Sequence, residues 1–390
     1  MRIITILFVS LLFSATVQAQ NESFNRPLRV AVFAQLFLDS TFSATGEYEY
    51  EDEMPRHVLP GLDFTEGLLL ALDSISTQTP IEVHILDLRS TEQSIQALEE
   101  GLFFDSTDLI IGAVSGNDYR QLAEKALLYN IPFLSATFPN DGGITQNPFT
   151  ILLNPTLPNH LKAIVQFVRK KCINYNVLYL RKKGSQEDKL ASLVNAANQS
   201  KSGIPVANWK SQSFPDTLDV LLLQSLLDST KKNLIISGSL DDKWAQQLLS
   251  FSPSSPAYEI EYMGMPNWET LKELNLPKHQ DKTVYYPTAF YKEGNKLAEQ
   301  FALNFIEKTN GKPSDLAYKG YETGICFIPK LLKEKYNFLN QITNASCNMF
   351  TNYQIEPVYL NQSLQPDYFE NKNSYIIQKS KGTATSVQTP

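Results

Sequence analysis

Two polar turns carry the side chains best suited to holding a small solute. The turn Ser115-Gly116-Asn117-Asp118 follows an apolar run and precedes an amphipathic one, so free N–H groups at a helix start would suit an anionic ligand group such as a carboxylate. The turn Ser135-Ala136-Thr137-Phe138 has two hydroxyls that can hydrogen-bond a solute and a ring that can cover it. The alternatives are an ordinary helix cap for the first turn and a loop that bonds only itself for the second.

Catalytic motifs are absent from the sequence. Gly112-Ala113-Val114-Ser115-Gly116 lacks the Gly-x-Ser-x-Gly spacing of a nucleophile elbow, and no phosphate-gripping Gly-x-x-x-x-Gly-Lys-Ser/Thr occurs. His160 and His279 have no motif that ties them to Ser115, and the scattered histidines do not indicate a zinc site. The dipole of a helix start alone explains the acidic pair Asp241-Asp242. We therefore expect a binding protein rather than an enzyme, with no cofactor and no metal.

The polar turns are positioned by short apolar runs that alternate with amphipathic stretches. The runs expected to form buried strands are 29–34, 81–87, 108–112 and 131–134, followed by 176–180, 233–237 and 258–264. Such alternation is typical of parallel sheets covered by helices on both faces. The sequence therefore predicts an α/β protein with two doubly wound parallel-sheet lobes. Ligands of such sheets bind beyond the carboxyl ends of the strands, where both polar turns lie.

The chain is expected to pass between the lobes more than once. The first break falls near Asn154–Pro158, and a later block of one strand and two helices is too small to bury a core alone, so it should return to the first lobe. The last strand candidates should return to the second lobe. The expected division is 27–153 plus 287–350 for the first lobe, 154–286 plus 351–380 for the second, and a disordered polar tail over 381–390.

The first residues are typical of a secretory signal. Arg2 precedes a short apolar run and a small-residue site, which predicts a signal peptide over 1–19 that is cleaved near Ala19. The alternative, a membrane anchor, would need a longer apolar run. We expect an exported, periplasmic protein with no membrane span after signal removal. In an oxidising compartment Cys326 and Cys347 can pair, although buried free thiols fit the sequence at least as well.

Composition and motif spacing argue against nucleic acids and dinucleotides as partners. The 390 residues carry 34 Lys+Arg against 41 Asp+Glu, a net charge of −7, and no basic block. No Gly-x-Gly-x-x-Gly follows the first strand, so Asp87 after the second strand does not indicate a dinucleotide site. The long loop from Asp39 to Gly61 holds an acidic and aromatic stretch, Glu47–Glu53, which could recognise cations or sugars, form a lid, or be a solvated insertion.

Four motifs in order resemble the type I periplasmic solute-binding proteins, above all the branched-chain amino-acid receptors of ABC transporters. They are Gly61–Asp73, Asp108–Ser115, Ile131–Thr137 and Gly320–Gly324. The resemblance covers nearly all of the chain after the signal, and it implies two lobes joined by three crossovers that close on a solute by hinge motion. The first motif and the acidic loop are also similar to envelope proteins of Bacteroidetes that carry a peptidoglycan-binding LysM module, but no such module is visible in this chain.

The resemblance also implies ligand residues in the first lobe. By position, the ligand turns of the family match Asn117, Ser135, Ala136, Thr137 and Pro139. In the family's amino-acid receptors, groups in these turns hold the α-carboxylate and the α-amine of the solute.

The second lobe departs from the family pattern at three places. Gln186-Glu187 stands where the family usually has Tyr-Gly, and Gly238-Ser239-Leu240-Asp241 stands where it often has an aromatic residue. Pro266 occupies the place expected for the acid that pairs a ligand amine, so Asp241 and Glu269 are the nearest substitutes. The resemblance therefore implies the fold more strongly than amino-acid specificity. The complete set of candidate ligand residues is Ser115, Asn117, Ser135, Ala136, Thr137, Phe138, Gln186, Ser239 and Asp241.

Two functions are compatible with these residues. The first is an extracytoplasmic receptor that closes on a small polar solute, such as an amino acid, and hands it to an ABC permease. The second is a cell-envelope interaction module with the same fold and a degenerate cleft, which binds a protein or a glycan. The polar turns of the first lobe favour the receptor, whereas the departures in the second lobe favour the interaction module.

Overall fold

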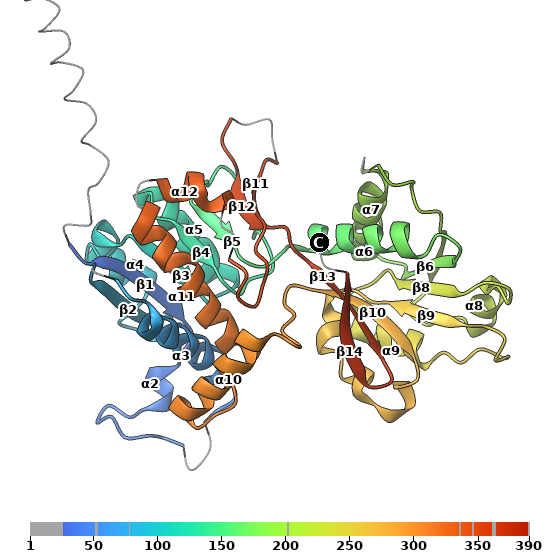
Figure 1. The fold of residues 1–390 in the computed structure, drawn as a ribbon, viewed down its shortest axis with the longest axis horizontal. Helices are drawn as coiled ribbons and strands as arrows, with labels where there is room; N and C mark the ends of the chain where they lie inside the picture. The colour runs from blue at the N-terminus through green and yellow to red at the C-terminus, as the bar shows by residue number, and fades with distance from the viewer. Residues whose placement is uncertain are drawn as a thin grey trace, which may run out of the picture.

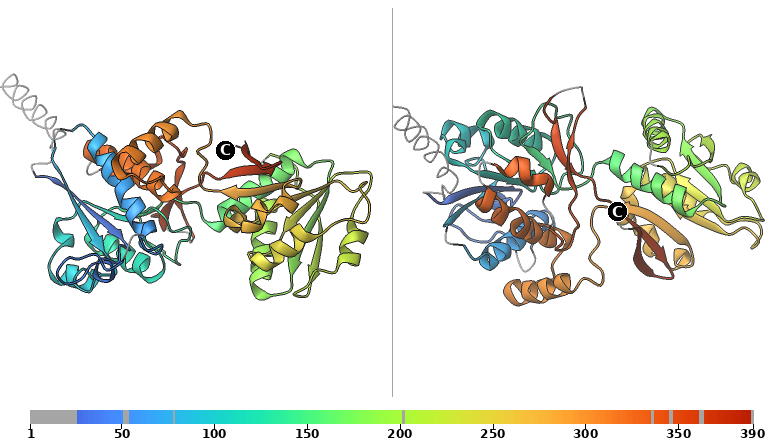
Figure 2. Two further views of the ribbon diagram at one scale, coloured as in Figure 1. Left: turned by 90° about the horizontal axis from the view of Figure 1, so that it is seen from below. Right: turned by 45° about the horizontal axis from the view of Figure 1, so that its top comes forward.

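The protein consists of two lobes, each built on a seven-stranded sheet with helices on both faces (Figure 1). The computed structural model describes residues 26–50, 54–77, 79–200, 203–334, 337–344, 347–360 and 364–388. The expected signal peptide over 1–19 and part of the acidic loop, 51–53, lie outside these residues. Figure 2 shows the lobes as separate bodies joined through a narrow connection. The predicted two-lobe α/β fold is confirmed.

The sheet of the first lobe has the strand order β11-β12-β5-β4-β3-β1-β2. All neighbours run parallel except β11, which is antiparallel to β12. Because helices cover both faces, strand residues such as Val30, Val32 and Ile111 are fully buried, which explains the unbroken apolar runs in the sequence. The strands are β1 (Leu28–Ala34), β2 (Ile81–Asp87), β3 (Leu109–Gly112), β4 (Phe133–Ser135), β5 (Thr150–Leu152), β11 (Ile355–Val358) and β12 (Tyr368–Asn371).

The sheet of the second lobe has the strand order β14-β13-β10-β9-β8-β6-β7. Its strands from β10 to β7 are parallel, whereas β13 is antiparallel to β10 and β14 is antiparallel to β13. The strands are β6 (Asn176–Lys182), β7 (Lys210–Phe214), β8 (Asn233–Ser237), β9 (Ile260–Met263), β10 (Thr283–Thr288), β13 (Tyr375–Ser380) and β14 (Thr383–Gln388).

Helices connect and cover the strands in both lobes. In the first lobe they are α2 (Leu38–Thr41), α3 (Leu59–Ser74), α4 (Ile95–Glu100), α5 (Gly116–Tyr129), α10 (Lys296–Thr309), α11 (Asp315–Glu334) and α12 (Phe338–Gln341). In the second lobe they are α6 (Leu157–Lys171), α7 (Ser185–Gln199), α8 (Val220–Leu226) and α9 (Asp242–Ser250). Short 3-10 helices occupy Phe104–Ser106, Pro266–Thr270, Lys272–Asn275, Pro277–His279 and Ile342–Asn344. Among the described helices, none combines the length and apolarity needed to cross a bilayer.

Two glycines let α3 and α11 approach each other closely. A Cβ atom at Gly67 would lie 1.9 Å from the carbonyl oxygen of Ala317, and a Cβ atom at Gly320 would lie 2.0 Å from the carbonyl oxygen of Phe64. Any larger residue would therefore push the helices apart. The first-helix motif and the Gly320–Gly324 motif are thus two sides of one helix contact, which attaches the returning chain to the first lobe.

The chain passes between the lobes three times, from β5 to α6, from β10 to α10 and from β12 to β13, as the resemblance implied. Buried polar side chains join two of these crossovers. Glu370 accepts a hydrogen bond from the Thr156 N–H at 2.7 Å and another from Nδ2 of Asn159. The hydroxyl of Ser374 lies 2.8 Å from Nδ1 of His160. Because these groups are buried and hydrogen-bonded, the connection has a defined geometry.

The expected division of the C-terminal region differs from the structure. The range 351–380 was expected in the second lobe, but β11 and β12 extend the first sheet beyond β5, and β13 is the first strand after them to join the second sheet. The range 381–390 was expected to be a disordered tail, yet β14 pairs with β13. Both differences arise because pairing partners, which the sequence pattern does not specify, decide where a short strand belongs.

One disulfide links two segments of the first lobe. Cys326 on α11 is bonded to Cys347, with 5.6 Å between their Cα atoms. Of the two possibilities that the sequence left open, a disulfide or two buried free thiols, the structure has the disulfide. Cys172 is a buried free thiol, and burial raises its pKa to about 12.

Candidate functional site

A pocket of about 280 Å³ lies at the carboxyl edge of the first sheet. Its walls come from the segments that follow β1, β3 and β4, from the loop that leads into α3, and from the start of α11. The carboxyl edge is where ligands of open α/β sheets bind, because the turns after the strands converge there. The lining residues are Gln35, Phe37, His57, Pro60, Gly61, Ala113, Thr137 and Leu316.

Asp87 holds one wall of this pocket in place. Its carboxylate is fully buried and accepts hydrogen bonds from the Leu36 N–H at 2.9 Å and the Leu38 N–H at 2.7 Å. These bonds clamp Phe37 between them in a left-handed backbone conformation, with φ of 57°. The Phe37 ring meets the ring of His57 edge-on, with 4.7 Å between centroids. Asp87 therefore shapes the pocket by binding backbone, rather than by binding a nucleotide ribose.

Thr137 is the predicted ligand residue that lines the pocket. Its carbonyl oxygen accepts a hydrogen bond from Nδ2 of Asn154 at 2.9 Å, which ties the turn after β4 to the first crossover. Ser115 and Asn117 are exposed at the start of α5, on the same edge of the sheet but outside the pocket lining.

The other predicted residues of the second polar turn face the protein interior. Ser135 and Ala136 are fully buried, and the Ser135 hydroxyl has no hydrogen-bond partner among the described residues. Phe138 packs against Tyr119, with 4.8 Å between ring centroids. Side chains alternate between opposite faces of an extended segment, so the residues of this turn cannot all point to the same side.

Apart from Thr137, no lining residue was among the ligand candidates named from the sequence. Gln35 and Phe37 directly follow β1, so the rule that placed ligands after strand ends would have found them if it had been applied to the first strand. His57 and Leu316 come from a loop and from a helix start that lie far from each other in the chain. No local pattern marks the latter two, because only tertiary packing brings them together.

The corresponding edge of the second lobe carries a charged network. Lys182 donates a hydrogen bond to Asp241, and this bond holds the pKa of the Asp241 carboxyl below its usual value. Ser239 donates to Oε1 of Glu187 at 2.8 Å, and its hydroxyl also accepts the Asp241 N–H at 3.2 Å. The structure thus brings the predicted residues Ser239 and Asp241 together. Gln186 is exposed on the first turn of α7 and makes no side-chain hydrogen bond within the described part of the chain.

Glu269 supplies a carboxylate close to both lobes. The Thr288 hydroxyl, at the end of β10, donates to its Oε1 at 2.6 Å. Lys292 on the second crossover forms an ion pair with Asp315, the first residue of α11. Desolvation raises the pKa of Glu269, the hydrogen bond from Thr288 opposes this effect, and the charge of Asp315 adds to it. The substitute acid named from the sequence therefore interacts electrostatically with the first lobe.

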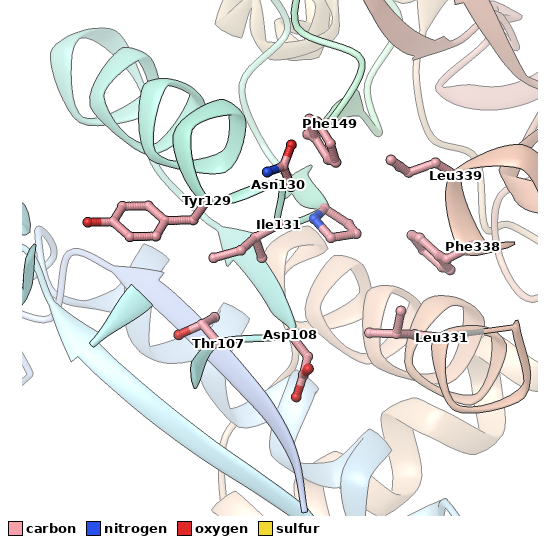
Figure 3. A pocket seen from close by; sticks show the side chains of 10 residues that line it. Thr107, Asp108, Tyr129, Asn130, Ile131, Phe149, Leu331, Phe338 and Leu339 are labelled. Carbon is pink, nitrogen blue, oxygen red and sulfur yellow. The ribbon is translucent and has the colours of Figure 1, made fainter. Parts of the chain in front are cut away.

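A different pocket of the first lobe lies at the opposite edge of the sheet (Figure 3). Ile131, just before β4, and Leu331 and Phe338 from α11 and α12 form its apolar side. The carboxylate of Asp108 points away from these side chains and makes two hydrogen bonds to Arg26, at 2.7 and 2.8 Å. Since this edge lacks the turns that follow the strands, we place the candidate solute site at the carboxyl edge.

No candidate metal centre accompanies these pockets. Within the described ranges, no three His, Cys, Asp or Glu side chains are grouped so as to hold a metal ion.

Comparisons with known proteins agree with this architecture. No protein-family model matches the chain, and no curated protein sequence is detectably similar to it. The solved branched-chain amino acid ABC transporter ligand-binding protein of Burkholderia xenovorans is 15% identical, with a TM-score of 0.63 over 93% of this chain and 95% of that one. A putative branched-chain amino acid ABC transporter from Rhodospirillum rubrum is 12% identical, with a TM-score of 0.67 over 93% and 100% of the two chains. The substrate-binding protein LivJ of Streptococcus pneumoniae, solved with isoleucine, is 12% identical, with a TM-score of 0.54 over 94% and 100%.

At these identities the comparisons show the fold. The chain has the two-lobe α/β fold of the type I periplasmic binding proteins, and its structural neighbours are ligand-binding proteins of ABC transporters. A shared fold does not identify a ligand, because ligand choice depends on the side chains of the site.

Proposed function

We propose that this protein is an extracytoplasmic receptor that closes its two lobes on a small polar solute, an amino acid or a related compound, for an ABC-type transporter. The pocket at the carboxyl edge of the first sheet is the observation that carries the proposal. A solute that contacted both this pocket and the second lobe would stabilise the closed arrangement over the open one.

The side chains at the site suit a solute with polar and apolar parts. The Thr137 hydroxyl and the Gln35 amide would hydrogen-bond the polar part, and the rings of Phe37 and His57 would pack against the apolar part. From the second lobe, the Glu269 carboxylate would pair with a cationic group such as an ammonium. This assignment replaces the acid that the family carries near Pro266 with an acid three residues later in the chain.

The exposed candidates have a more peripheral role in this proposal. Ser115, Asn117 and Gln186 would contact the solute at the rim of the closed site, while Ser239 would position Asp241 through its hydrogen bond. The alternative function, an interaction module with a degenerate cleft, is not adopted, because neither the geometry nor the structural neighbours support it.

A ligand screen tests the proposal directly. Thermal unfolding of the mature protein would be followed with amino acids, short peptides, sugars and small aromatic acids. A ligand at one hundred times its Kd stabilises the folded state by about 2.7 kcal/mol, which is readily measured as a rise in Tm. The absence of a shift throughout a broad panel would contradict the receptor function.

Thr137→Ala localises any ligand that the screen finds. Loss of one hydrogen bond of about 1 kcal/mol should weaken binding about five-fold, as measured by isothermal titration calorimetry. Thr230→Ala serves as the matched control, since Thr230 is exposed at the far, amino edge of the second sheet. Equal affinities in the wild type and Thr137→Ala would place the ligand outside this pocket.

A further inference from the structure

A polar pocket of about 250 Å³ bridges the two lobes beside the crossovers. Its walls are formed by α6 of the second lobe, by β11 and the residue before it in the first lobe, and by the third crossover between β12 and β13. Figure 1 shows α6 and β11 on either side of the junction between the lobes. This pocket shares no lining residue with the candidate solute pocket.

The periods of the helix and the strand bring its polar side chains together. Asn159, Lys162 and Gln166 are three or four positions apart and lie on one face of α6. Gln354, which directly precedes β11, and Glu356 on β11 are two positions apart and line the same pocket. Carboxamides and charged groups from two separate bodies therefore face one space.

Two charged side chains in this pocket, Lys162 and Glu356, are available to a ligand. The third charged residue, Lys372, already has a partner, because its Nζ donates to Oε2 of the buried Glu370 at 2.6 Å. Lys162 and Glu356 are both exposed, and in the described part of the chain neither forms an ion pair or a side-chain hydrogen bond, with each other or with any other residue. A free ammonium from one lobe thus faces the same pocket as a free carboxylate from the other.

We propose that this pocket binds a small zwitterion, whose carboxylate pairs with Lys162 and whose ammonium pairs with Glu356. The carboxamides of Gln166 and Gln354 complete the hydrogen bonds. A ligand with a single charge leaves one of the two side chains unpaired, so it binds less tightly. Because the two charged residues belong to different lobes, occupancy depends on the angle between the lobes and is coupled to binding in the cleft, with equal effect in both directions.

The ligand is tested with amino acids of increasing charge separation. Glycine, β-alanine, γ-aminobutyrate and 6-aminohexanoate are titrated into the mature full chain by calorimetry, with acetate and methylammonium as singly charged controls. One chain length should bind best, and both single ions should bind about ten-fold more weakly. No detectable binding by any of the four amino acids would overturn the proposal.

Variants then assign the site independently of the receptor function. Lys162→Gln and Glu356→Gln should each weaken the best probe about ten-fold, whereas Lys170→Gln, exposed on the same helix but outside the pocket, should not. Thr137→Ala identifies any probe that binds the candidate solute pocket instead, because such a probe loses affinity in Thr137→Ala and keeps it in Lys162→Gln and Glu356→Gln. Failure of the solute pocket and failure of this pocket therefore give different results. Binding that is lost in Thr137→Ala but retained in both pocket variants would overturn the proposal. So would an energetic coupling between Lys162→Gln and Glu356→Gln in the ligand-free protein, because it would show that the two residues pair with each other.

Discussion

At the scale of single residues, His160 makes the junction of the lobes sensitive to acid. Burial lowers the pKa of this imidazole to about 4, and its Nδ1 lies 2.8 Å from the hydroxyl of Ser374 on the third crossover. In the unfolded chain the His160 imidazole binds a proton more readily than in the folded protein. The contribution of neutral His160 to the free energy of unfolding is therefore complete above its ordinary pKa of 6.5 and is lost as the pH falls toward 4. We expect protonation of His160 alone to lower the free energy of unfolding by about 3 kcal/mol as the pH falls from 7 to 4, as measured by urea denaturation.

His160→Asn supplies the comparison for this measurement, because an amide can keep a hydrogen bond to Ser374 but does not titrate. The variant should show a shallower loss of stability over the same pH interval. Parallel pH profiles for the two proteins would show that other groups cause the acid sensitivity.

At the scale of elements, the disulfide between Cys326 and Cys347 secures the end of the first lobe. It fastens α11 to the segment that leads into β11, across a sequence separation of 21 residues. By restricting the unfolded chain, a crosslink of this span contributes about 3 kcal/mol. We expect a reducing agent, or the double variant Cys326→Ser and Cys347→Ser, to lower the free energy of unfolding by about that amount in chemical denaturation.

The effect of the reductant should vanish in the double variant, since the remaining Cys172 is a free thiol. A reductant that destabilised the variant and the wild type equally would show that this bond is not the source of the effect.

The elements themselves were predictable to different degrees. The buried central strands β1, β3 and β8 stand out as apolar runs, because both of their faces are covered. The strand β7, with the sequence KSQSF, was missed because it lies at the edge of its sheet and is mostly polar. The strand β5 was missed because three residues are too few to show a period.

At the scale of the whole molecule, three crossovers join the two lobes, and the proposed receptor function requires the lobes to close on a solute. If a solute contacts both carboxyl edges, it must favour the closed state by about 5.5 kcal/mol to turn a population that is 1% closed into one that is 99% closed. We expect small-angle X-ray scattering to show a smaller radius of gyration at saturating solute.

Thr137→Ala should need a higher solute concentration for the same decrease in radius. Identical scattering curves with and without a tightly bound solute would contradict closure, while leaving the binding itself intact.

The sequence by itself determined the two α/β lobes, the repeated exchange of the chain between them and the edge of the sheet at which to look for a ligand. These properties follow from local periodicity, from the inability of a block of one strand and two helices to bury a core alone, and from the general rule that turns converge at the carboxyl ends of parallel strands. Tertiary structure alone decided that β11 and β12 complete the first sheet, that Thr137 shares a pocket with His57 and Leu316, and that Lys162 and Glu356 face one space between the lobes. The physical reason is that these contacts join segments far apart in the chain, and their formation depends on which surfaces pack together rather than on any pattern within one segment.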